Sequence, residues 1–309
     1  MLNKTIRILN FDDSVIRQGN LLAQHKPEII DLRGLAPRAR LWMDAGTKNA
    51  VVKCLGPALE NSVTFLGSGD FHHLSLVLLE RIKEPFSLIV FDFHPDWDTL
   101  PPKFGCGSWV TQALKNKNLL KCVLLGASSS DISAWHIQSA NLSSLKNNRL
   151  EIYPYAHAPT RVFLRKVPQN LSLKQEKRFL STVIYWEELK NKDLSNFLPA
   201  LFGRLPGRRV YLSIDKDCLQ QKYALTNWEE GLFTLDDLLL ALKMMRDNLE
   251  IIGADVTGDY SEPAVSGRLK KILSGLDHPK EVAAQKYPQD FINATNEAVN
   301  LAILAALTS

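Results

Sequence analysis

The sequence predicts an α/β protein of three layers, α/β/α, with helices on both faces of a central, mostly parallel sheet of about eight strands. Apolar runs of strand length alternate with stretches of helical periodicity along most of the chain, which is typical of doubly wound parallel sheets. Several runs are apolar at every position, as expected of strands buried on both faces. Because no repeat, low-complexity tract or linker interrupts this alternation, we expect one domain over residues 1–309.

The expected strands are short, and helical stretches separate most of them. They lie at residues 6–11, 63–66, 87–93, 123–127, 150–155, 182–186, 209–215 and 251–256. The segment 29–52 has no clear pattern, and the polar segment 156–177 is expected to form loops or an excursion outside the core. Helices are expected at 74–83, 235–245 and 291–307. Thr234 is the expected N-cap of the second helix, with Asp236 and Asp237 in its first turn, where they suit the helix dipole.

The composition is that of an ordinary globular protein, and from it we expect no nucleic acid and no membrane as partner. Of 309 residues, 45% are hydrophobic and 23% charged, and the formal net charge of +4 is not gathered into a long basic run. The four cysteines form no Cys-x-x-Cys pair, so we expect free thiols in a reducing compartment. The first residues contain no signal-peptide core and the apolar runs are too short to span a membrane, which favours the cytoplasm. The expected partner is a small-molecule substrate, and a homo-oligomer is compatible with this sequence.

Candidate metal ligands directly follow one of these strands. The run 88–91 is continuously apolar and ends at four polar residues, Asp92, His94, Asp96 and Asp98. Because side chains alternate along a strand, Asp92 and His94 point to the same side. Asp98 is expected to lie behind the ligands or at the surface. Carboxylates and an imidazole at the carboxyl end of a parallel strand are half of a metal site.

A second strand ends in the same way, and a glycine turn brings a third contribution. Asp215 and Asp217 follow the apolar run 209–214 two positions apart, so they too share a face. Segment 66–73, Leu-Gly-Ser-Gly-Asp-Phe-His-His, places histidines after the strand 63–66. Taken singly, such residues also fit hydrogen-bonded strand ends or helix caps. Together they predict a metal site, because carboxylates buried side by side need a cation to compensate them.

In order and spacing these motifs resemble those of the ureohydrolases, the family of arginase, agmatinase and formiminoglutamase, which shares its fold with the histone deacetylases. That family carries Gly-Gly-Asp-His, Asp-x-His-x-Asp and Ser-x-Asp-x-Asp after strands of a parallel sheet. The corresponding segments here are 69–72, 92–96 and 213–217. The chain therefore resembles a divergent branch of that family.

The resemblance implies a site for two divalent ions, about 3.5 to 4 Å apart, that lower the pKa of a bridging water. The implied ligands are His72 and Asp96 on the first ion, His94 and Asp217 on the second, and Asp92 and Asp215 on both. Oxygen-rich ligation with two imidazoles and no thiolate favours Mn²⁺, although Fe²⁺, Ni²⁺, Co²⁺ or Zn²⁺ would fit.

The histidine of the glycine turn is ambiguous, because Asp-Phe-His-His has one residue more than the family's Asp-His. Counting from His72 places Leu74, Leu76 and Leu79 on the apolar stripe of the following helix better than counting from His73 does. We therefore expect His72 to bind metal and His73 to contact substrate, with the reverse assignment left open.

Departures from the family concern proton transfer and substrate. The family's shuttle histidine corresponds to Cys106, a thiol that could ionise near cations and take that role, or could be a semi-buried thiol in a glycine turn. The family's guanidinium-binding glutamate corresponds to Gly258, which leaves Asp259 beside it as the acidic candidate and puts arginine and agmatine in doubt as substrates. Trp228 and Glu229 could wall the pocket, with packing as the preferred interpretation of Trp228.

The expected function is that of a metal-dependent hydrolase, which cleaves a non-peptide carbon–nitrogen bond in a guanidino, amidino or amide compound. The alternative is a catalytically degenerate relative that binds metal as a scaffold or sensor, because the glutamate and the shuttle histidine of the family are missing. A metallophosphoesterase is less compatible, since its Asp-x-His would precede the Gly-Asp motif and no Gly-Asn-His follows.

Overall fold

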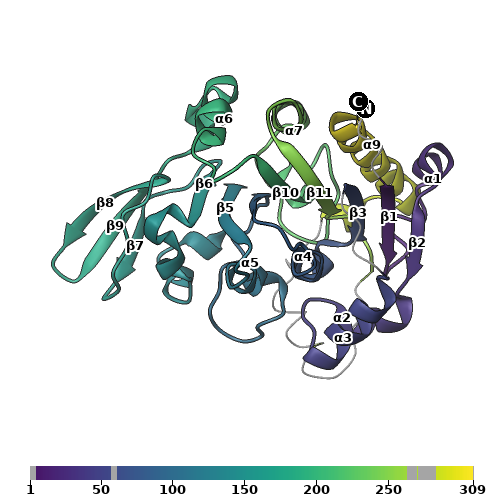
Figure 1. The fold of residues 1–309 in the computed structure, drawn as a ribbon, viewed down its shortest axis with the longest axis horizontal. Coiled ribbons are helices and arrows are strands. Elements are labelled where there is room, and N and C mark those ends of the chain that lie inside the picture. Colours follow the sequence, from purple (N-terminus) through teal and green to yellow (C-terminus); the bar gives the residue numbers. More distant parts are fainter. Residues whose placement is uncertain (1–4, 57–60, 263–269, 271–282, 309) are drawn as a thin grey trace.

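The computed structural model describes residues 5–56, 61–262, 270 and 283–308, and its main sheet has eight strands that all run parallel. The strand order is β2-β1-β3-β11-β10-β4-β5-β6 (Figure 1). The strands are β1 Thr5–Asn10, β2 Glu28–Asp31, β3 Ser62–Gly67, β4 Phe86–Phe91, β5 Leu119–Gly126, β6 Leu150–Pro154, β10 Arg209–Asp215 and β11 Glu250–Thr257. The predicted α/β class with a central parallel sheet is confirmed.

Helices cover both faces of this sheet and complete the three layers (Figure 1). On one face lie α1 Gly19–His25, α6 Leu194–Phe202, α7 Leu235–Asn248 and α9 Gln289–Thr308. On the other lie α2 Ala36–Ala39, α3 Ala45–Cys54, α4 Ser75–Leu79 and α5 Trp109–Ala113. Their buried side chains form separate hydrophobic clusters with the strands, with Leu242 and Ile303 in one and Val110 in another. The core is therefore divided by the sheet.

The helix α7 begins where the sequence predicts. The Thr234 side chain accepts a hydrogen bond from the amide of Asp237 at 3.1 Å, which is the geometry of an N-cap. Its buried residues Leu238, Leu242 and Met245 recur at helical spacing and face the sheet. The expected helix 74–83 is shorter than predicted: Leu74 belongs to the 3₁₀ turn Gly69–Leu74, and the helix α4 ends at Leu79.

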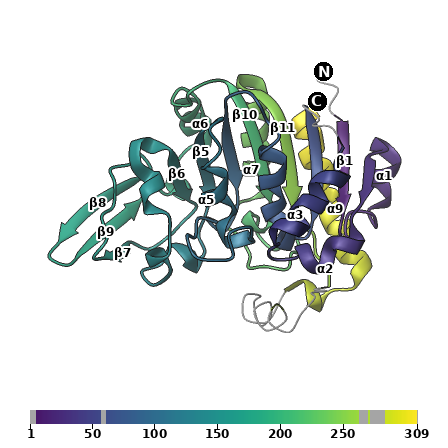
Figure 2. The ribbon, with the colours of Figure 1, turned by 60° about the horizontal axis from the view of Figure 1, so that its bottom comes forward.

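One predicted strand lies outside the main sheet. The strand predicted at 182–186 does not join the main sheet; it is β9 Ser181–Trp186, which pairs antiparallel with β7 Thr160–Phe163 and β8 Leu173–Arg178. The segment 156–177, expected to form loops or an excursion outside the core, contributes to a second sheet of three strands that extends from the body of the molecule (Figure 2). It is therefore an excursion, and it contains strands that the sequence did not predict. The eighth place in the main sheet belongs to β2, an edge strand that is largely exposed and therefore has no apolar run.

None of the described helices is long and apolar enough to cross a membrane. All four cysteines are free thiols, as expected from their spacing. The single-domain assignment for residues 1–309 stays a prediction.

Candidate metal centre

The three sequence motifs meet at the carboxyl edge of the main sheet. In the register of the parallel pair β4 and β10, Phe91 lies beside Ile214, so Asp92 and Asp215 follow at the same level. The strand β3 lies on the other side of β11, and the glycine turn that follows it brings His72 to this edge. Residues more than a hundred positions apart therefore converge because their strands are neighbours.

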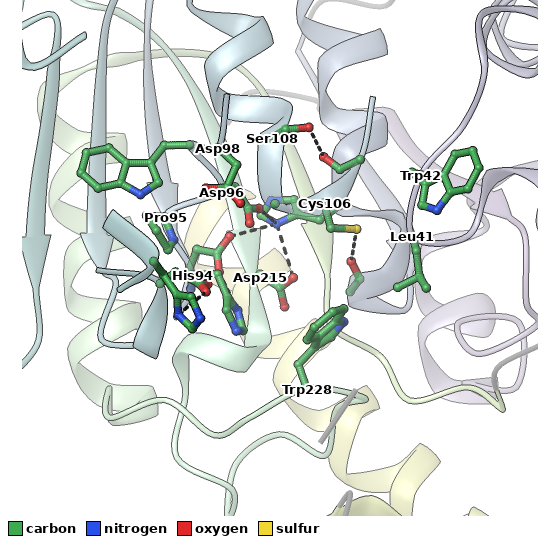
Figure 3. Close-up of a pocket in the computed structure, with 18 of the residues that line it drawn as sticks. Leu41, Trp42, His94, Pro95, Asp96, Asp98, Cys106, Ser108, Asp215 and Trp228 are labelled. Atoms are coloured by element: carbon green, nitrogen blue, oxygen red, sulfur yellow. Dashed lines mark hydrogen bonds and ion pairs between the residues drawn. The ribbon is translucent and has the colours of Figure 1, made fainter. Parts of the chain in front are cut away.

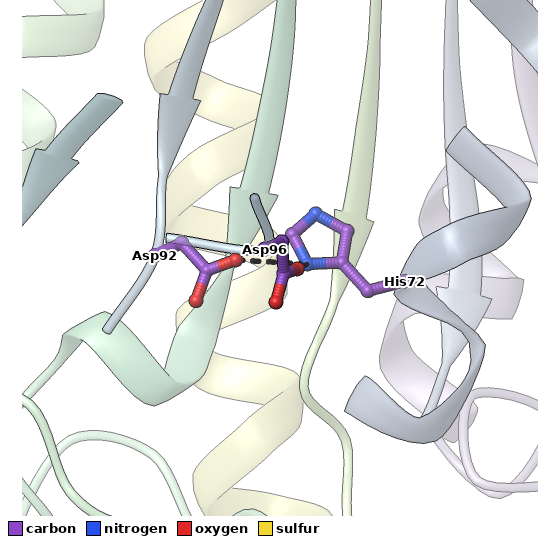
Figure 4. Close-up of side chains that lie close together, drawn as sticks. All are labelled: His72, Asp92 and Asp96. Atoms are coloured by element: carbon purple, nitrogen blue, oxygen red, sulfur yellow. Dashed lines mark ion pairs between the residues drawn. The ribbon is translucent and has the colours of Figure 1, made fainter. Parts of the chain in front are cut away.

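A first cluster forms around His72 (Figure 4). Its Nδ1 lies 3.1 Å from Asp92 Oδ2, 3.4 Å from Asp215 Oδ2 and 3.6 Å from Asp96 Oδ2. All four residues are buried. Within this cluster, ligand atoms of His72, Asp92 and Asp96 lie within 4.8 Å of one another, close enough for a single ion.

A second cluster shares Asp92 with the first. His94 Nδ1 lies 2.9 Å from Asp217 Oδ2 and 3.7 Å from Asp92 Oδ1. His94 Nε2 lies 3.1 Å from Glu229 Oε2, so the ring is held between two carboxylates. The backbone amides of His94 and Phe93 donate to Asp92 Oδ1 and Asp217 Oδ1 at 2.7 and 3.0 Å, which fixes the direction of both carboxylates.

These residues fit a divalent cation by their electrostatics. Asp92 Oδ2 is buried and accepts no well-aligned hydrogen bond within the described part of the chain, so it is open to a cation. Burial raises the pKa of Asp96 and Asp215 well above the usual carboxyl range, and the charges of Asp92 and Asp217 raise them further. Burial and the charge of Asp92 likewise raise the pKa of Asp217 to about 6. A bound cation would offset the cost of burying these charges and the repulsion between them.

Polar residues behind the first cluster orient its histidine. His72 Nε2 lies 2.8 Å from Ser213 Oγ, and Ser213 Oγ donates to Asp255 Oδ1 at 2.7 Å. Because Nε2 is engaged there, Nδ1 faces the carboxylates. Trp109 packs its ring 4.8 Å from that of His72 and donates from Nε1 to Asp96 Oδ2 at 2.6 Å. The cluster is thus held by contacts that do not depend on an ion.

The two histidines of the glycine turn point in different directions. His73 is fully buried and is not among the residues that line the cavity described below; its Nδ1 lies 3.5 Å from Cys106 Sγ. Burial lowers the pKa of His73 to about 3, so it is neutral at physiological pH. The geometry favours His72 as the ligand, and the expected contact of His73 with substrate is corrected, because the 3₁₀ turn directs this side chain into the protein.

The Asp70 carboxylate of the glycine turn serves packing and stays out of both clusters. Arg40, buried against the Phe71 ring, forms an ion pair with Asp70, and Trp228 Nε1 donates to Asp70 Oδ1 at 3.0 Å. These contacts anchor the turn that carries His72. The Arg40 interaction has no local sequence signal, since Arg40 lies 30 residues before Asp70.

A cavity of about 590 Å³ opens over both clusters (Figure 3). Seven carboxylate residues line it, namely Asp92, Asp96, Asp98, Asp131, Asp215, Asp217 and Glu229. Within the described part of the chain no lysine or arginine lines it. The predicted wall residues Trp228 and Glu229 are at the cavity, as is Cys106, and Trp228 also packs edge-on against His94 at 5.5 Å between ring centroids. The sequence did not single out Asp131 and His136, which lie at the cavity on loops with cap-like sequences.

Cys106 lies in the wall as a hydrogen-bond donor. Its Sγ donates to the backbone oxygen of Asp70 at 3.3 Å and lies 3.5 Å from that of Gly69. Burial raises the pKa of this thiol well above its usual value, and the charges of Asp96 and Asp70 act in the same direction. These surroundings favour the neutral thiol over the thiolate that the sequence suggested.

Asp259 does not reach the cavity, which corrects its expected catalytic place. Its carboxylate forms a buried ion pair with Lys216 Nζ at 2.9 Å and accepts a hydrogen bond from Gln18 Nε2 at 2.6 Å. The reason lies in Gly258, which has a φ of +91° and whose backbone is so close that an added Cβ would lie 2.5 Å from Asp215 Oδ1. The chain therefore turns away from the metal centre at this point.

The all-parallel eight-stranded sheet flanked by helices makes this chain an α/β protein with an arginase-like fold. The chain belongs to the Arginase family, whose model matches residues 63–258. An uncharacterised protein of Thermotoga maritima is 33% identical over 210 residues, which cover 66% of this chain and 62% of that protein.

Solved structures of the family share this fold at low sequence identity. Proclavaminate amidino hydrolase from Streptomyces clavuligerus has a TM-score of 0.55 and 12% identity, covering 100% of this chain and 94% of its own. Formimidoylglutamase from Bacillus subtilis has a TM-score of 0.56 and 13% identity, covering 98% and 86%. Arginase from Bacillus cereus has a TM-score of 0.56 and 12% identity, covering 99% and 98%. At such identities the likeness establishes the fold alone.

Proposed function

We propose that this protein is a metal-dependent hydrolase that cleaves a carbon–nitrogen bond other than a peptide bond. The observation that carries the proposal is the pair of His/Asp clusters that share Asp92 at the floor of an acidic cavity. Family membership supports it, as do the names of structural relatives, which include an amidino hydrolase, a formimidoylglutamase and an arginase. Two divalent ions, Mn²⁺ first among the candidates, would be held by His72, Asp92, His94, Asp96, Asp215 and Asp217. Such ions supply Lewis acidity and a water of lowered pKa.

The protein's own contribution is a site arranged in advance. Ser213 behind His72 and Glu229 behind His94 hold the two rings with Nδ1 toward the carboxylates. The amide of Phe93 holds Asp217. Groups fixed in this way need little reorganisation when a ligand arrives, which is how preorganised sites lower a barrier.

A leaving amine also needs a proton, and two side chains at the cavity can carry one. Cys106 is the inner candidate, because its thiol hydrogen lies in the cavity wall next to the clusters. His136 is the outer candidate, with Nδ1 3.0 Å from the backbone oxygen of Ser130 and 3.9 Å from Asp131 Oδ1. Its exposed imidazole can exchange protons with solvent. We assign proton delivery to Cys106 and exchange to His136.

The charge of the cavity favours a cationic substrate. Two divalent ions would balance the four aspartates of the clusters. The described lining also carries the carboxylates of Asp98, Asp131 and Glu229, and it contains no lysine or arginine. A guanidinium, amidinium or ammonium group complements this field, whereas an anionic substrate would be repelled.

The experiment is to measure metal content and turnover together. We expect the Mn²⁺-loaded protein to retain bound metal through dialysis and to release urea or ammonia from at least one member of a panel of cationic guanidino, amidino and amide compounds. Asp92→Asn and Asp215→Asn should lose both metal and turnover, and Asp31→Asn, at an exposed carboxylate on β2, should lose neither. Unchanged metal content in both site variants would refute the assignment of the site.

A second candidate is a relative that binds metal without turnover and acts as a scaffold or sensor. The observation that favours it is the absence of an acidic side chain from position 258, together with the engagement of Asp259 by Lys216. Stoichiometric Mn²⁺ binding with no product from any compound of the panel would support this candidate. Turnover of any of them, lost in Asp92→Asn, would reject it.

A further inference from the structure

The second sheet ends in an exposed apolar tip. It comprises the end of β7 and the β8–β9 turn, with Phe163, Leu164, Phe179 and Leu180 exposed by 44%, 83%, 98% and 59%. The amide of Leu164 donates to the backbone oxygen of Leu180 at 3.2 Å, so the two pairs lie side by side. Figures 1 and 2 show this end of the sheet directed away from the eight-stranded sheet and from the helices. Four large apolar side chains thus lie at the most remote part of the molecule.

The tip does not follow the ordinary rules of a hairpin. Arg178 pairs with Ser181, which leaves Phe179 and Leu180 as the two residues of the turn, where glycine, asparagine and aspartate are preferred. Leu164 has a φ of +51°, a conformation that a leucine adopts at a cost. Contiguous exposed apolar surface of this kind marks an interaction site more often than chance exposure.

Basic residues surround the tip. The segment 160–180 contains six lysines and arginines and one acid, Glu176, a net charge of +5 in a chain whose formal net charge is +4. The rest of the chain is therefore close to neutral. Within the described residues Arg161, Lys166 and Lys177 form no ion pair, whereas Glu176 is neutralised by Arg178 at 3.0 Å. The positive charge around the tip is available to an external anion.

From this arrangement we infer that the tip docks on an anionic phospholipid surface, with the apolar side chains in the interface and the basic residues at the headgroups. An apolar wedge with a basic collar matches the two forces that hold peripheral proteins on such membranes. Contact between two identical tips would bring like charges together. Nucleic acid would match the charge, but its phosphate backbone has no apolar surface on which four hydrocarbon side chains could be buried. This is peripheral contact and requires no spanning helix.

The test is co-sedimentation of the full chain with vesicles of phosphatidylcholine alone or with added phosphatidylglycerol. We expect binding only to the anionic vesicles, weakening as salt is raised. The double variant Phe179→Ser, Leu180→Ser should bind about tenfold less or weaker still. The matched control is Leu171→Ser, at a leucine of the same segment that is 53% exposed outside the tip, which should bind like the parent.

The charge contribution is tested by Lys166→Glu with Lys177→Glu, which should weaken binding and flatten its salt dependence. Lys83→Glu with Lys117→Glu, at exposed lysines far from the tip in sequence, is the control. Circular dichroism and thermal midpoints equal to those of the parent would exclude misfolding as the cause. Equal binding by the parent and the tip variants, or no binding by the parent, overturns the inference. Binding of DNA with the same dependence on the tip would also overturn the inference, in favour of nucleic acid. An oligomer that is lost only in the Phe179→Ser, Leu180→Ser variant would overturn it in favour of contact between copies of the chain.

Discussion

Mn²⁺ should stabilise the folded protein much more at about pH 7 than at about pH 5, because ions and protons compete for the same carboxylates. The pKa of Asp217 is raised to about 6 from its ordinary value of 3.8 by burial and by the charge of Asp92. In the metal-free protein this shift contributes stability that is fully present below pH 3.8 and is lost as the pH rises through 6. An ion that binds at low pH must first displace that proton.

Asp217 alone gives a lower bound for the difference in Mn²⁺ stabilisation between the two pH values. Between about pH 5 and about pH 7 its carboxyl group loses nearly one proton, which makes metal binding about 1.4 kcal/mol, or about tenfold, less favourable at the lower pH. Asp96, Asp215 and His94, whose pKa values are also raised, act in the same direction. The pKa of His73 is lowered to about 3, so its effect on the pH dependence of stability has the opposite sign. This effect is the same with and without Mn²⁺ and cancels in the difference between the two.

The assay measures the free energy of unfolding in urea, with tryptophan fluorescence as the signal. Chelator-treated protein is unfolded with and without added Mn²⁺ at each pH. Asp217→Asn should reduce the pH dependence of the Mn²⁺ stabilisation. Asp31→Asn, at an exposed carboxylate whose pKa is lowered to about 2, should leave it unchanged. Equal stabilisation by Mn²⁺ at both pH values would show that these carboxylates do not bind the ion.

Three further substitutions test the surroundings of the site. Lys216→Met breaks a buried ion pair and should lower the free energy of unfolding by about 3–5 kcal/mol in urea titrations; a loss below about 1 kcal/mol would contradict this. Gly258→Ala should lower the free energy of unfolding by about 1–3 kcal/mol and weaken Mn²⁺ binding, because the added Cβ would meet the carboxylate of Asp215. The control is Gly207→Ala, which should change neither quantity, because an added Cβ there has nothing within 4 Å. His72→Asn should lower Mn²⁺ affinity by more than about 100-fold in calorimetric titrations, since even outer partners of ligands contribute about 10–100-fold. His73→Asn should mainly lower stability, and a larger loss of affinity in this variant would reverse the two assignments.

Most of the fold could be predicted because its central strands carry their own signal. The strands β4 and β10 are buried on both faces, so they read as continuous apolar runs whatever their neighbours are. The opposite holds at the edges, where β2 is exposed and β8 has mainly charged and polar residues. Such strands are defined by their hydrogen-bonded partner and not by an apolar pattern, so sequence reasoning placed them in loops or left them unassigned.

The candidate ligands were predictable for a related reason. Alternation along a strand places Asp92 with His94 and Asp215 with Asp217 on shared faces, and the carboxyl ends of parallel strands meet at one edge. The histidine of the glycine turn was not decidable in this way, because a 3₁₀ turn directs neighbouring side chains differently from a strand or helix. The anchoring of the turn through Asp70 and the contact of His72 Nε2 with Ser213 together direct His72 toward the carboxylates.

The sequence by itself determined the α/β class, the order of the central strands along the chain and the residue types at the metal centre, since local burial and spacing specify these. The tertiary structure alone decided which acids face the cavity. Asp259 is drawn away from it by Lys216 and by Gln18, a residue 241 positions distant, while Asp131 is brought to it from a neighbouring loop. Contacts over such separations depend on how whole elements pack, and no local pattern of residues encodes them.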